Sequence, residues 1–262
     1  MGLPVHAVVR CVQPVAEDQV VLGSDHGLVL LSDTAATPVP FPKGSRKEAR
    51  DVLSLAWHNN TLHIATSRGQ YTWDLKSPLN GRGLPKDGSG GFDDLRALYS
   101  TGNRLLKAWR THTEGGAGPA DVLCFTQDDQ ENVFVGTSDG VLAQLDGPEL
   151  ERYRTNGHTA PVRHLAWCQE TLWIAAGGAL HRHTTTTRDS RPGEPLALCT
   201  DDQDRLWAIE RNRLAVGYGD WPSPLGVELE RPWCLAASET ALWVGARGGL
   251  YRFYFSEFAS QT

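Results

Sequence analysis

Apolar residues recur along this chain in short runs that polar turns separate at nearly constant intervals. Each run opens with an apolar pair, passes through a small residue and a tight turn, and leads into a second apolar segment. Six clear copies of this pattern open at Val20, Leu62, Val133, Leu172, Leu206 and Leu242. The interval of 71 residues between the second and third copies is nearly two periods, so we expect a weakened copy inside it, at residues 104–109. Such self-similarity predicts a repeat protein.

A further apolar segment precedes most copies, and its residues alternate between apolar and polar. Such segments occupy residues 52–57, 95–98, 122–125, 162–167 and 196–199. Alternation with a period of two is typical of a half-buried β-strand. Polar turns rich in Asp, Asn and Gln follow at residues 58–60, 127–130 and 201–204, where side-chain hydrogen bonds to the backbone favour a chain reversal. Each unit is therefore predicted to be strand, turn, strand, glycine turn and strand, with helix nearly absent.

The number and length of these units predict how they are assembled. Units of three or four antiparallel strands cannot bury both faces alone, and radial stacking around a central channel is the usual solution. Seven units in 262 residues average about 37 residues each, close to the period of known propeller repeats. The sequence therefore predicts an all-β, seven-bladed β-propeller that forms one domain over residues 1–262. The alternatives are a six-bladed ring with an irregular, glycine-rich insert at residues 80–120, and a β-sandwich.

The two ends of the sequence predict how the ring closes. The last unit has candidate strands at residues 232–237, 241–245 and 250–255, and the few polar residues after them are too short for a fourth strand. The first strand of the first unit aligns near Cys11 to Val15, which leaves the residues before it without a role. We therefore predict that a segment within Leu3 to Val9 pairs as the outer strand of the last blade, because an open ring leaves a strand edge unpaired.

Two groups of residues resemble known propeller repeats. The segments at 129–141 and 242–253 are similar to the repeat of two-component-regulator sensor propellers. Gly157-His158 resembles the opening of a WD40 repeat, and Trp73-Asp74 resembles its ending, although only one unit carries each pair. The resemblance implies a divergent propeller. It implies no particular function, because propellers carry many unrelated activities.

Charge, the N-terminal residues and the cysteines indicate which partners and which cellular location the sequence favours. The formal net charge of -6 disfavours nucleic acid and anionic lipid as partners. The N-terminal residues lack the features of a signal peptide, and no stretch is apolar enough to span a membrane. The five cysteines are widely spaced and contain no Cys-x-x-Cys, so neither a disulfide framework nor a zinc site is indicated. These features predict a cytoplasmic protein.

The residues most often used for chemistry have structural interpretations here. Trp173, Trp207 and Trp243 hold the same place in the second strand of three units, where packing between blades is expected. Cys124, Cys199 and Cys234 lie in first strands, where a small apolar residue packs well. His181 and His183 would lie on one face of a strand, but two imidazoles do not make a metal site. No nucleophile elbow, phosphate loop or zinc-protease motif is present, so no catalytic residue, metal or cofactor is predicted.

The turns offer the remaining candidate surface. In a propeller, the turn between the second and third strands lies on the same face as the entry to the first strand. These turns and entries are predicted to present the binding residues Asp25, His26, Arg68, Asp139, Arg211, Arg247 and Trp233. Adaptable polar loops on rigid strands suit protein recognition. The hypothesis is a non-catalytic interaction scaffold or regulatory subunit that binds another protein. The alternatives are a small-ligand sensor, and a hydrolase or lyase whose catalytic residues are scattered over several blades.

Overall fold

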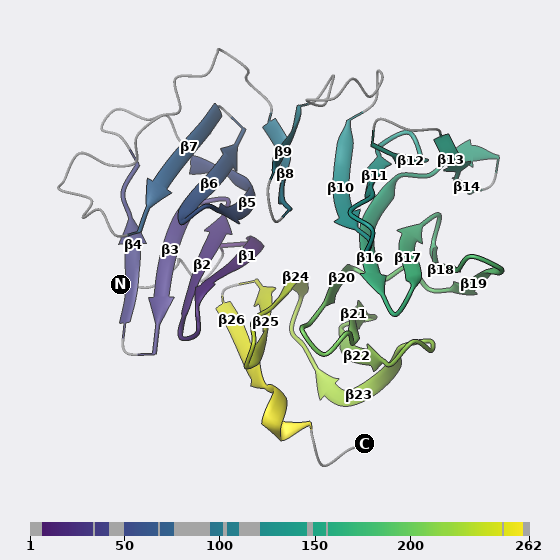
Figure 1. Cartoon of the computed structure of the whole chain (residues 1–262). Helices are drawn as coiled ribbons and strands as arrows, with labels where there is room; N and C mark the ends of the chain where they lie inside the picture. The colour runs from purple at the N-terminus through teal and green to yellow at the C-terminus, as the bar shows by residue number, and fades with distance from the viewer. Residues whose placement is uncertain are drawn as a thin grey trace. The chain divides into compact units, whose positions relative to one another are not determined.

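The chain consists of antiparallel β-sheets grouped in two compact units. The computed structural model describes residues 7–33, 35–41, 50–67, 69–75, 95–101, 104–109, 121–145, 149–155, 157–247 and 249–258. The first unit comprises Met1–Trp109 and Arg231–Thr262, and the second comprises Arg110–Glu230. Within each sheet the strands are neighbours in chain order (Figure 1). The first unit thus combines the first sheet of the chain with the last.

The described residues of the first unit form four sheets. The first contains β1 (Val9–Ala16), β2 (Gln19–Ser24), β3 (Gly27–Ser32) and β4 (Ala35–Val39). The second contains β5 (Val52–His58), β6 (Thr61–Thr66) and β7 (Gly69–Asp74). A two-stranded sheet contains β8 (Leu95–Ser100) and β9 (Leu105–Trp109). The last sheet contains β24 (Pro232–Ala237), β25 (Ala241–Ala246) and β26 (Gly249–Tyr254), and the 3-10 turn η2 (Phe255–Glu257) follows it.

The second unit holds three four-stranded sheets and a short ribbon. Its first sheet contains β10 (Val122–Gln127), β11 (Val133–Thr137), β12 (Val141–Gln144) and β13 (Glu149–Arg152). The ribbon pairs β14 (Arg154–Thr155) with β15 (His158–Thr159). The next sheet contains β16 (Val162–Cys168), β17 (Thr171–Ala176), β18 (Ala179–His183) and β19 (Arg188–Pro192). The last contains β20 (Ala197–Thr200), β21 (Leu206–Glu210), β22 (Arg213–Gly217) and β23 (Ser223–Glu228).

The polar turns of the sequence become tight hairpins. Asn59 and Asn60 join β5 to β6 with φ values of 48° and 59°, and Gln169 and Glu170 join β16 to β17 with φ values of 47° and 56°. Two successive residues in the left-handed region make the hairpin turn whose twist matches that of the flanking strands. The polar side chains predicted at residues 58–60 therefore mark a real reversal.

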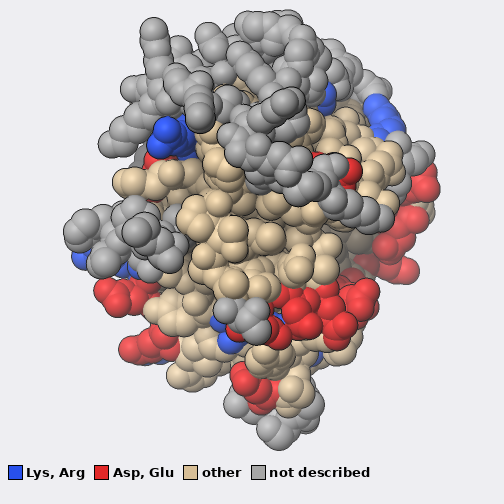
Figure 2. Space-filling view, turned by 90° about the vertical axis from the view of Figure 1, so that its left-hand side faces the viewer, with Lys and Arg blue, Asp and Glu red and all other residues tan. Residues whose placement is uncertain are grey.

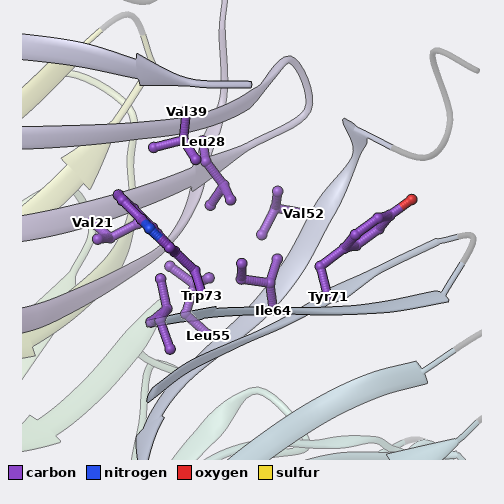
Figure 3. Packing of buried hydrophobic residues seen from close by; sticks show 9 residues of the cluster. Val21, Leu28, Val39, Val52, Leu55, Ile64, Tyr71 and Trp73 are labelled. Atoms are coloured by element: carbon purple, nitrogen blue, oxygen red, sulfur yellow. The ribbon is translucent and has the colours of Figure 1, made fainter. Parts of the chain in front are cut away.

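Apolar side chains from adjacent sheets of the first unit form one of the cores. Val21 and Leu28 of the first sheet pack with Leu55, Ile64 and Trp73 of the second (Figure 3). All five are at most 8% exposed. Neither sheet buries this face alone, which is the physical reason why the units must stack.

The tryptophans of the second strands are core residues, as the sequence predicts. Trp173 and Trp207 are fully buried and Trp243 is 5% exposed. The ring of Trp173 also meets Trp221 edge to face, with centroids 5.3 Å apart. Large rings at one repeated position fill the space against the neighbouring sheet in these units.

The number of complete blades is lower than the sequence predicts. Six sheets have three or four strands, so the prediction of seven blades is corrected to six and the stated alternative is supported. The weakened copy at residues 104–109 does form a strand, β9, and within the described ranges its sheet has two strands. β8 lies beside β5 of the second sheet. The described residues of the region 80–120 thus form a strand pair where the six-bladed alternative placed an irregular insert.

The predicted closing strand does not appear among the described residues. Val9 belongs to β1 of the first sheet, and Val8 makes an isolated antiparallel bridge to Arg247. Residues 1–6 lie outside the described ranges, so an outer strand there stays a prediction. The first and last sheets are joined in two other ways. The Cys234 thiol lies 3.7 Å from the Val9 carbonyl oxygen, and Arg252 of β26 pairs with Asp18 at 3.1 Å.

Helical structure is sparse in the part of the chain that the structure describes, with η2 as its named element. No helix within these residues has the length and apolar character that a membrane crossing needs.

Candidate interaction surface

The first strand of most sheets contains a β-bulge at its second residue. The pairing register shifts between Val9 and Cys11, between Val122 and Cys124, and at the same place in four other sheets. The residues inside these bulges are Arg10, Leu53, Arg96, Leu123, Arg163 and Trp233. Bulges re-aim a side chain and are frequent at rims and functional sites. We call these six residues and Leu196 the rim positions.

Leu196 is counted among the rim positions because Ala197, the residue after it, pairs in the same place in its sheet as the residue after a bulge does in the other sheets. Ala197 pairs with Ile209 in the last sheet of the second unit, as Cys234 pairs with Gly245 in the last sheet of the first. The Leu196 N–H donates to the Ile209 carbonyl at 2.8 Å. Leu196 therefore stands where the other sheets have their bulge, although its own sheet has no register shift.

In three of these sheets the residue after the bulge is a cysteine that faces a glycine. Cys11 pairs with Gly23, Cys124 with Gly136 and Cys234 with Gly245. A methyl group on Gly136 would lie 2.7 Å from the Cys124 sulfur, closer than real side chains approach. Each thiol thus fills the space that the glycine leaves open.

Burial determines the chemistry of these thiols. It raises the pKa of Cys234 to about 12, and it also raises the pKa of Cys11 and Cys124. A thiol that stays protonated is a poor nucleophile. The predicted packing role of Cys124 and Cys234 is therefore confirmed, whereas Cys199 pairs with Trp207 at a different position.

Asp25 and His26 lie together with Arg247 in the first unit. The Val8 N–H donates to the Asp25 carboxylate at 3.0 Å, and Val8 bridges to Arg247. The Arg247 N–H in turn donates to the Arg231 carbonyl at 3.1 Å. Three of the predicted binding residues are thus held at one edge of neighbouring sheets.

The Asp25 carboxylate is stabilised in its ionised form. Partial burial would raise its pKa, but the hydrogen bonds from His26 and from the Val8 N–H outweigh burial and lower it. The His26 ring nitrogen Nδ1 lies 2.8 Å from Asp25 Oδ1. Asp25 is therefore occupied by internal partners rather than free for a ligand.

Trp233 occupies the bulge of β24 and is 52% exposed. It lies two residues after Arg231, whose carbonyl accepts a hydrogen bond from the Arg247 N–H. The guanidinium groups of Arg231 and Arg247 have no ion-pair partner among the residues described, whereas Arg10 pairs with Asp51 at 3.3 Å. Trp233, Arg231 and Arg247 are exposed residues at one sheet edge, and neither arginine has an ion-pair partner in the described ranges. In the view of Figure 2, Asp and Glu side chains gather in several groups and Lys and Arg occupy smaller areas.

Asp139 belongs to the second unit and is engaged internally. It lies in the turn between β11 and β12, where it accepts from the Thr137 hydroxyl. Arg152 of β13 pairs with its other oxygen at 3.4 Å. These contacts hold the turn against the outer strand, which is a structural role.

Arg211 lies at the edge of a hollow of about 640 Å³ in the second unit. It forms the turn between β21 and β22 with Asn212, at φ values of 49° and 64°. The hollow is lined by polar residues that include Glu194, Glu210 and Arg213. Most of these are paired: Arg163 with Glu194 at 3.4 Å, and Arg213 with Glu228 at 2.8 Å.

The turns and the strand entries share an edge within each sheet, as predicted. The backbone of Ser67 donates to Asp51 at 3.1 Å, and that of Ser138 donates to Asp121 at 2.8 Å. Arg68 lies outside the described residues. Asp25, His26, Arg247 and Trp233 belong to the first unit, whereas Asp139 and Arg211 lie in two different sheets of the second.

Apart from Trp233, the rim positions are not predicted from the sequence. A signal was present, because Cys11, Cys124 and Cys234 align and the residue before each is the bulged one. Alternation with a period of two places a side chain on one face or the other, whereas a bulge breaks that rule.

The two histidines at 181 and 183 have separate partners. His181 Nε2 lies 3.0 Å from the Ala176 carbonyl oxygen, while His183 Nε2 lies 3.2 Å from the Tyr153 hydroxyl. The described residues include no group of three or more His, Cys, Asp or Glu side chains that could hold a metal ion.

Comparisons with known proteins show a fold and no family. No protein-family model matches the sequence, and no curated protein matches it. Among solved structures, the extracellular domain of the hybrid two-component system BT4673 from B. thetaiotaomicron is similar, with a TM-score of 0.77 and 16% identity. The match covers 94% of this chain but 38% of that one, so the chain spans well under half of this relative.

Two further structures have similar lengths. The WD40 β-propeller domain of Doa1 matches with a TM-score of 0.70 and 14% identity, over 94% of this chain and 92% of that one. Virginiamycin B lyase from Staphylococcus aureus matches with a TM-score of 0.67 and 10% identity, over 94% and 93%. Identities this low show the fold alone. The chain is therefore an all-β β-propeller, related in fold to extracellular two-component-system domains and to WD40 propellers.

Proposed function

We propose that this chain is a non-catalytic interaction module, a scaffold or regulatory subunit, that binds another protein through the rim positions and the adjacent turns of the first unit. The observation that carries this proposal is Trp233, which a β-bulge directs into solvent. Arg231 and Arg247 lie at the same sheet edge and have no ion-pair partner among the described residues. Tryptophan and arginine are the residue types most enriched among interface hot spots.

The exposure of large apolar residues supports a binding role for rim positions in each unit taken by itself. Leu196, Tyr218, Trp233 and Tyr254 are the large hydrophobic residues that stand exposed among those described. Two of these four, Leu196 and Trp233, are rim positions. Exposing so much apolar surface costs about 25 cal/mol per Å² relative to burial, and a partner that covers it recovers this free energy.

Charge indicates the chemistry of the partner. Asp25 accepts from Val8 and His26, and Asp51 pairs with Arg10, so the acidic groups of this edge have internal partners. Arg231 and Arg247 are left to contact a carboxylate of the partner. We therefore expect the partner to place an acidic segment near an apolar or aromatic anchor.

The alternatives have weaker support. A ligand sensor and a hydrolase or lyase are suggested by the structures of similar fold, but likenesses of 10 to 16% identity carry no activity to this chain. The cytoplasmic setting likewise stays a prediction, since the name of the first similar structure describes an extracellular domain.

A site-specific photocrosslink tests the proposal. A benzophenone amino acid is placed at position 233 in the host cell, and at position 254 as a control, because Tyr254 is similarly exposed at 41% but is no rim position. We expect one discrete adduct from position 233 and none of that mass from position 254. Charge reversal at Arg247 in the same protein should reduce the adduct at least about tenfold.

Three results would contradict the proposal. They are equal adducts from both positions, no discrete adduct from position 233, and an adduct that charge reversal leaves unchanged. The melting temperature of each variant serves as the folding control, since exposed substitutions change stability by about 0.5 kcal/mol or less.

A further inference from the structure

A second hollow lies in the second unit, at the opposite sheet edge from the rim positions. It has a volume of about 500 Å³ and is lined by residues of two adjacent sheets, β10–β13 and β16–β19. The hairpin turns β10–β11, β16–β17 and β18–β19 border it. The rim positions instead adjoin the turns between second and third strands. Successive turns of an antiparallel sheet lie at opposite edges, so this hollow is separate from the proposed protein-binding surface.

The floor of the hollow is apolar and largely aromatic. Phe134 of β11 and Trp167 of β16 stack with ring centroids 6.2 Å apart and planes at 7°. Leu150 and Leu172 complete this floor. Phe134, Leu150 and Trp167 are only partly buried, although they pack on the core beneath them. Apolar surface in a concave site is the usual feature of a small-molecule pocket.

His183 and Arg188 line the hollow and belong to a group of interacting polar side chains that also includes Tyr153 and Glu151. The Tyr153 hydroxyl donates to Glu151 Oε2 at 3.2 Å and lies 3.2 Å from His183 Nε2. Arg188 approaches the same Glu151 oxygen at 3.6 Å. Burial lowers the pKa of His183, Arg188 and His181 lower it further, and Glu151 opposes them. The neutral form of His183 is therefore favoured, and the one arginine that lines the hollow already has a carboxylate partner.

The opposite border carries carboxylates that differ in their partners. Asp128 accepts from the backbone N–H groups of Gln130 and Asn132 at 2.9 Å and 2.8 Å, so it stabilises its own turn. Asp129 and Glu170 have no ion-pair or hydrogen-bond partner among the described residues, and both line the hollow. The unmatched charge at the hollow is therefore negative.

We propose that this hollow binds a small organic cation, an ammonium group attached to an aromatic or aliphatic body. The ammonium group pairs with Asp129 and Glu170, and the apolar body covers Phe134 and Trp167. Aromatic faces attract cations through their quadrupole, which adds to the effect of the carboxylates. An organic anion would face two unpaired carboxylates, and its one cationic partner, Arg188, is already paired with Glu151.

The test compares three probes of nearly equal shape and different charge. The full chain is titrated calorimetrically with 2-phenylethylammonium, 2-phenylethanol and phenylacetate at low ionic strength. We expect the amine to bind at least about tenfold more tightly than the alcohol, and the carboxylate to bind most weakly. Added salt should weaken the binding of the amine more than that of the alcohol.

Variants then assign the binding to this hollow. The double variant Asp129→Asn with Glu170→Gln should reduce amine affinity about tenfold and leave alcohol binding unchanged. Glu228→Gln is the matched control, because its exposed carboxylate borders the other hollow of the same unit. Circular dichroism confirms that each variant is folded.

Several outcomes overturn the proposal. With the probes, they are tighter binding of the alcohol or the carboxylate than of the amine, and no binding of any probe at about 10 mM. With the variants, they are amine binding that survives in the double variant, and a loss of amine affinity in the Glu228 variant equal to that in the double variant. Because no rim position takes part, failure here leaves the proposed protein-binding role standing.

Discussion

The indole nitrogen of Trp207 donates a hydrogen bond of 2.7 Å to Asp201 Oδ2, inside the last sheet of the second unit. Arg205 Nε donates to the same oxygen at 2.6 Å. Both charged side chains are nearly inaccessible, with Asp201 0% and Arg205 5% exposed. Asp201 Oδ1 also accepts from the backbone of Gln203 and Arg205, each at 3.0 Å. One carboxylate therefore holds both the turn between β20 and β21 and the core tryptophan.

Removing this carboxylate should destabilise the fold. Asp201→Ala leaves the Arg205 guanidinium buried without its partner, and breaking a buried pair costs about 3 to 5 kcal/mol. Urea unfolding of the parent, of this variant and of Asp202→Ala measures the effect, since Asp202 is an exposed neighbour in the same turn. A loss at position 201 no larger than the loss at position 202 would show that the network contributes little.

Truncating a buried and an exposed tryptophan should change the free energy of unfolding by very different amounts. Trp207→Ala removes a fully buried ring and should cost about 3 to 5 kcal/mol, because the core cannot fill the cavity. Trp233→Ala removes a ring that is 52% exposed and should change the free energy of unfolding by about 0.5 kcal/mol or less. Chemical denaturation of both variants and of the parent protein measures the two losses in free energy of unfolding. Equal losses would refute the assignment of Trp233 to the surface.

The glycine opposite the bulge should not tolerate a methyl group. Gly136→Ala places a carbon 2.7 Å from the Cys124 sulfur and against Val162, so overpacking should cost about 1 to 3 kcal/mol. Gly226→Ala is the matched control, since nothing lies within 4 Å of the added carbon there. Thermal melts of the two variants should separate clearly, and coincident melts would mean that the bulge packs more loosely than the structure indicates.

The stability of the protein should fall between pH 6.5 and pH 4 because of His164. Burial lowers its pKa to about 4, and Arg163 adds repulsion. An unfolded histidine has a pKa of about 6.5, so between these values only the unfolded chain binds the proton. The contribution is complete above pH 6.5 and is lost as the pH falls to 4, and it amounts to about 3 kcal/mol at most.

His164→Gln should flatten this part of the pH profile. Denaturation midpoints from pH 4 to pH 8 measure it, with His158→Gln as the control because His158 is exposed. A His164→Gln profile that still falls as steeply as that of the parent protein would assign the effect to other groups.

The contacts of Val8 should make the N-terminal residues important for stability. Val8 exchanges hydrogen bonds with Asp25 and bridges to Arg247, and Ala7 is fully buried. Removal of residues 1–8 should lower the free energy of unfolding by about 2 kcal/mol or more, since it also exposes a strand edge. A cut after residue 6 keeps these contacts, and the difference between the two truncations isolates them. Identical melting curves for the parent and both truncations would exclude a role for this segment.

The sequence by itself determined the strands, the hairpins and the core tryptophans. These features depend on neighbours within a few residues. Apolar alternation over residues 162–167 predicts a strand. The Asn59-Asn60 pair allows two successive residues in the left-handed region, as a tight hairpin needs. A tryptophan that recurs at positions 173, 207 and 243 indicates a burial position that the units share. The recurrence of such units then predicted a propeller, which the comparisons bear out.

Only the tertiary structure decided which side chains meet. The bulge that exposes Trp233 depends on pairing with β25. The number of blades depends on how many strands each sheet completes. The hollow lined by Phe134 and Trp167 depends on two sheets lying together. The physical reason is that register and sheet-to-sheet packing are set by contacts between residues far apart in the chain, and those contacts leave no local periodicity to read.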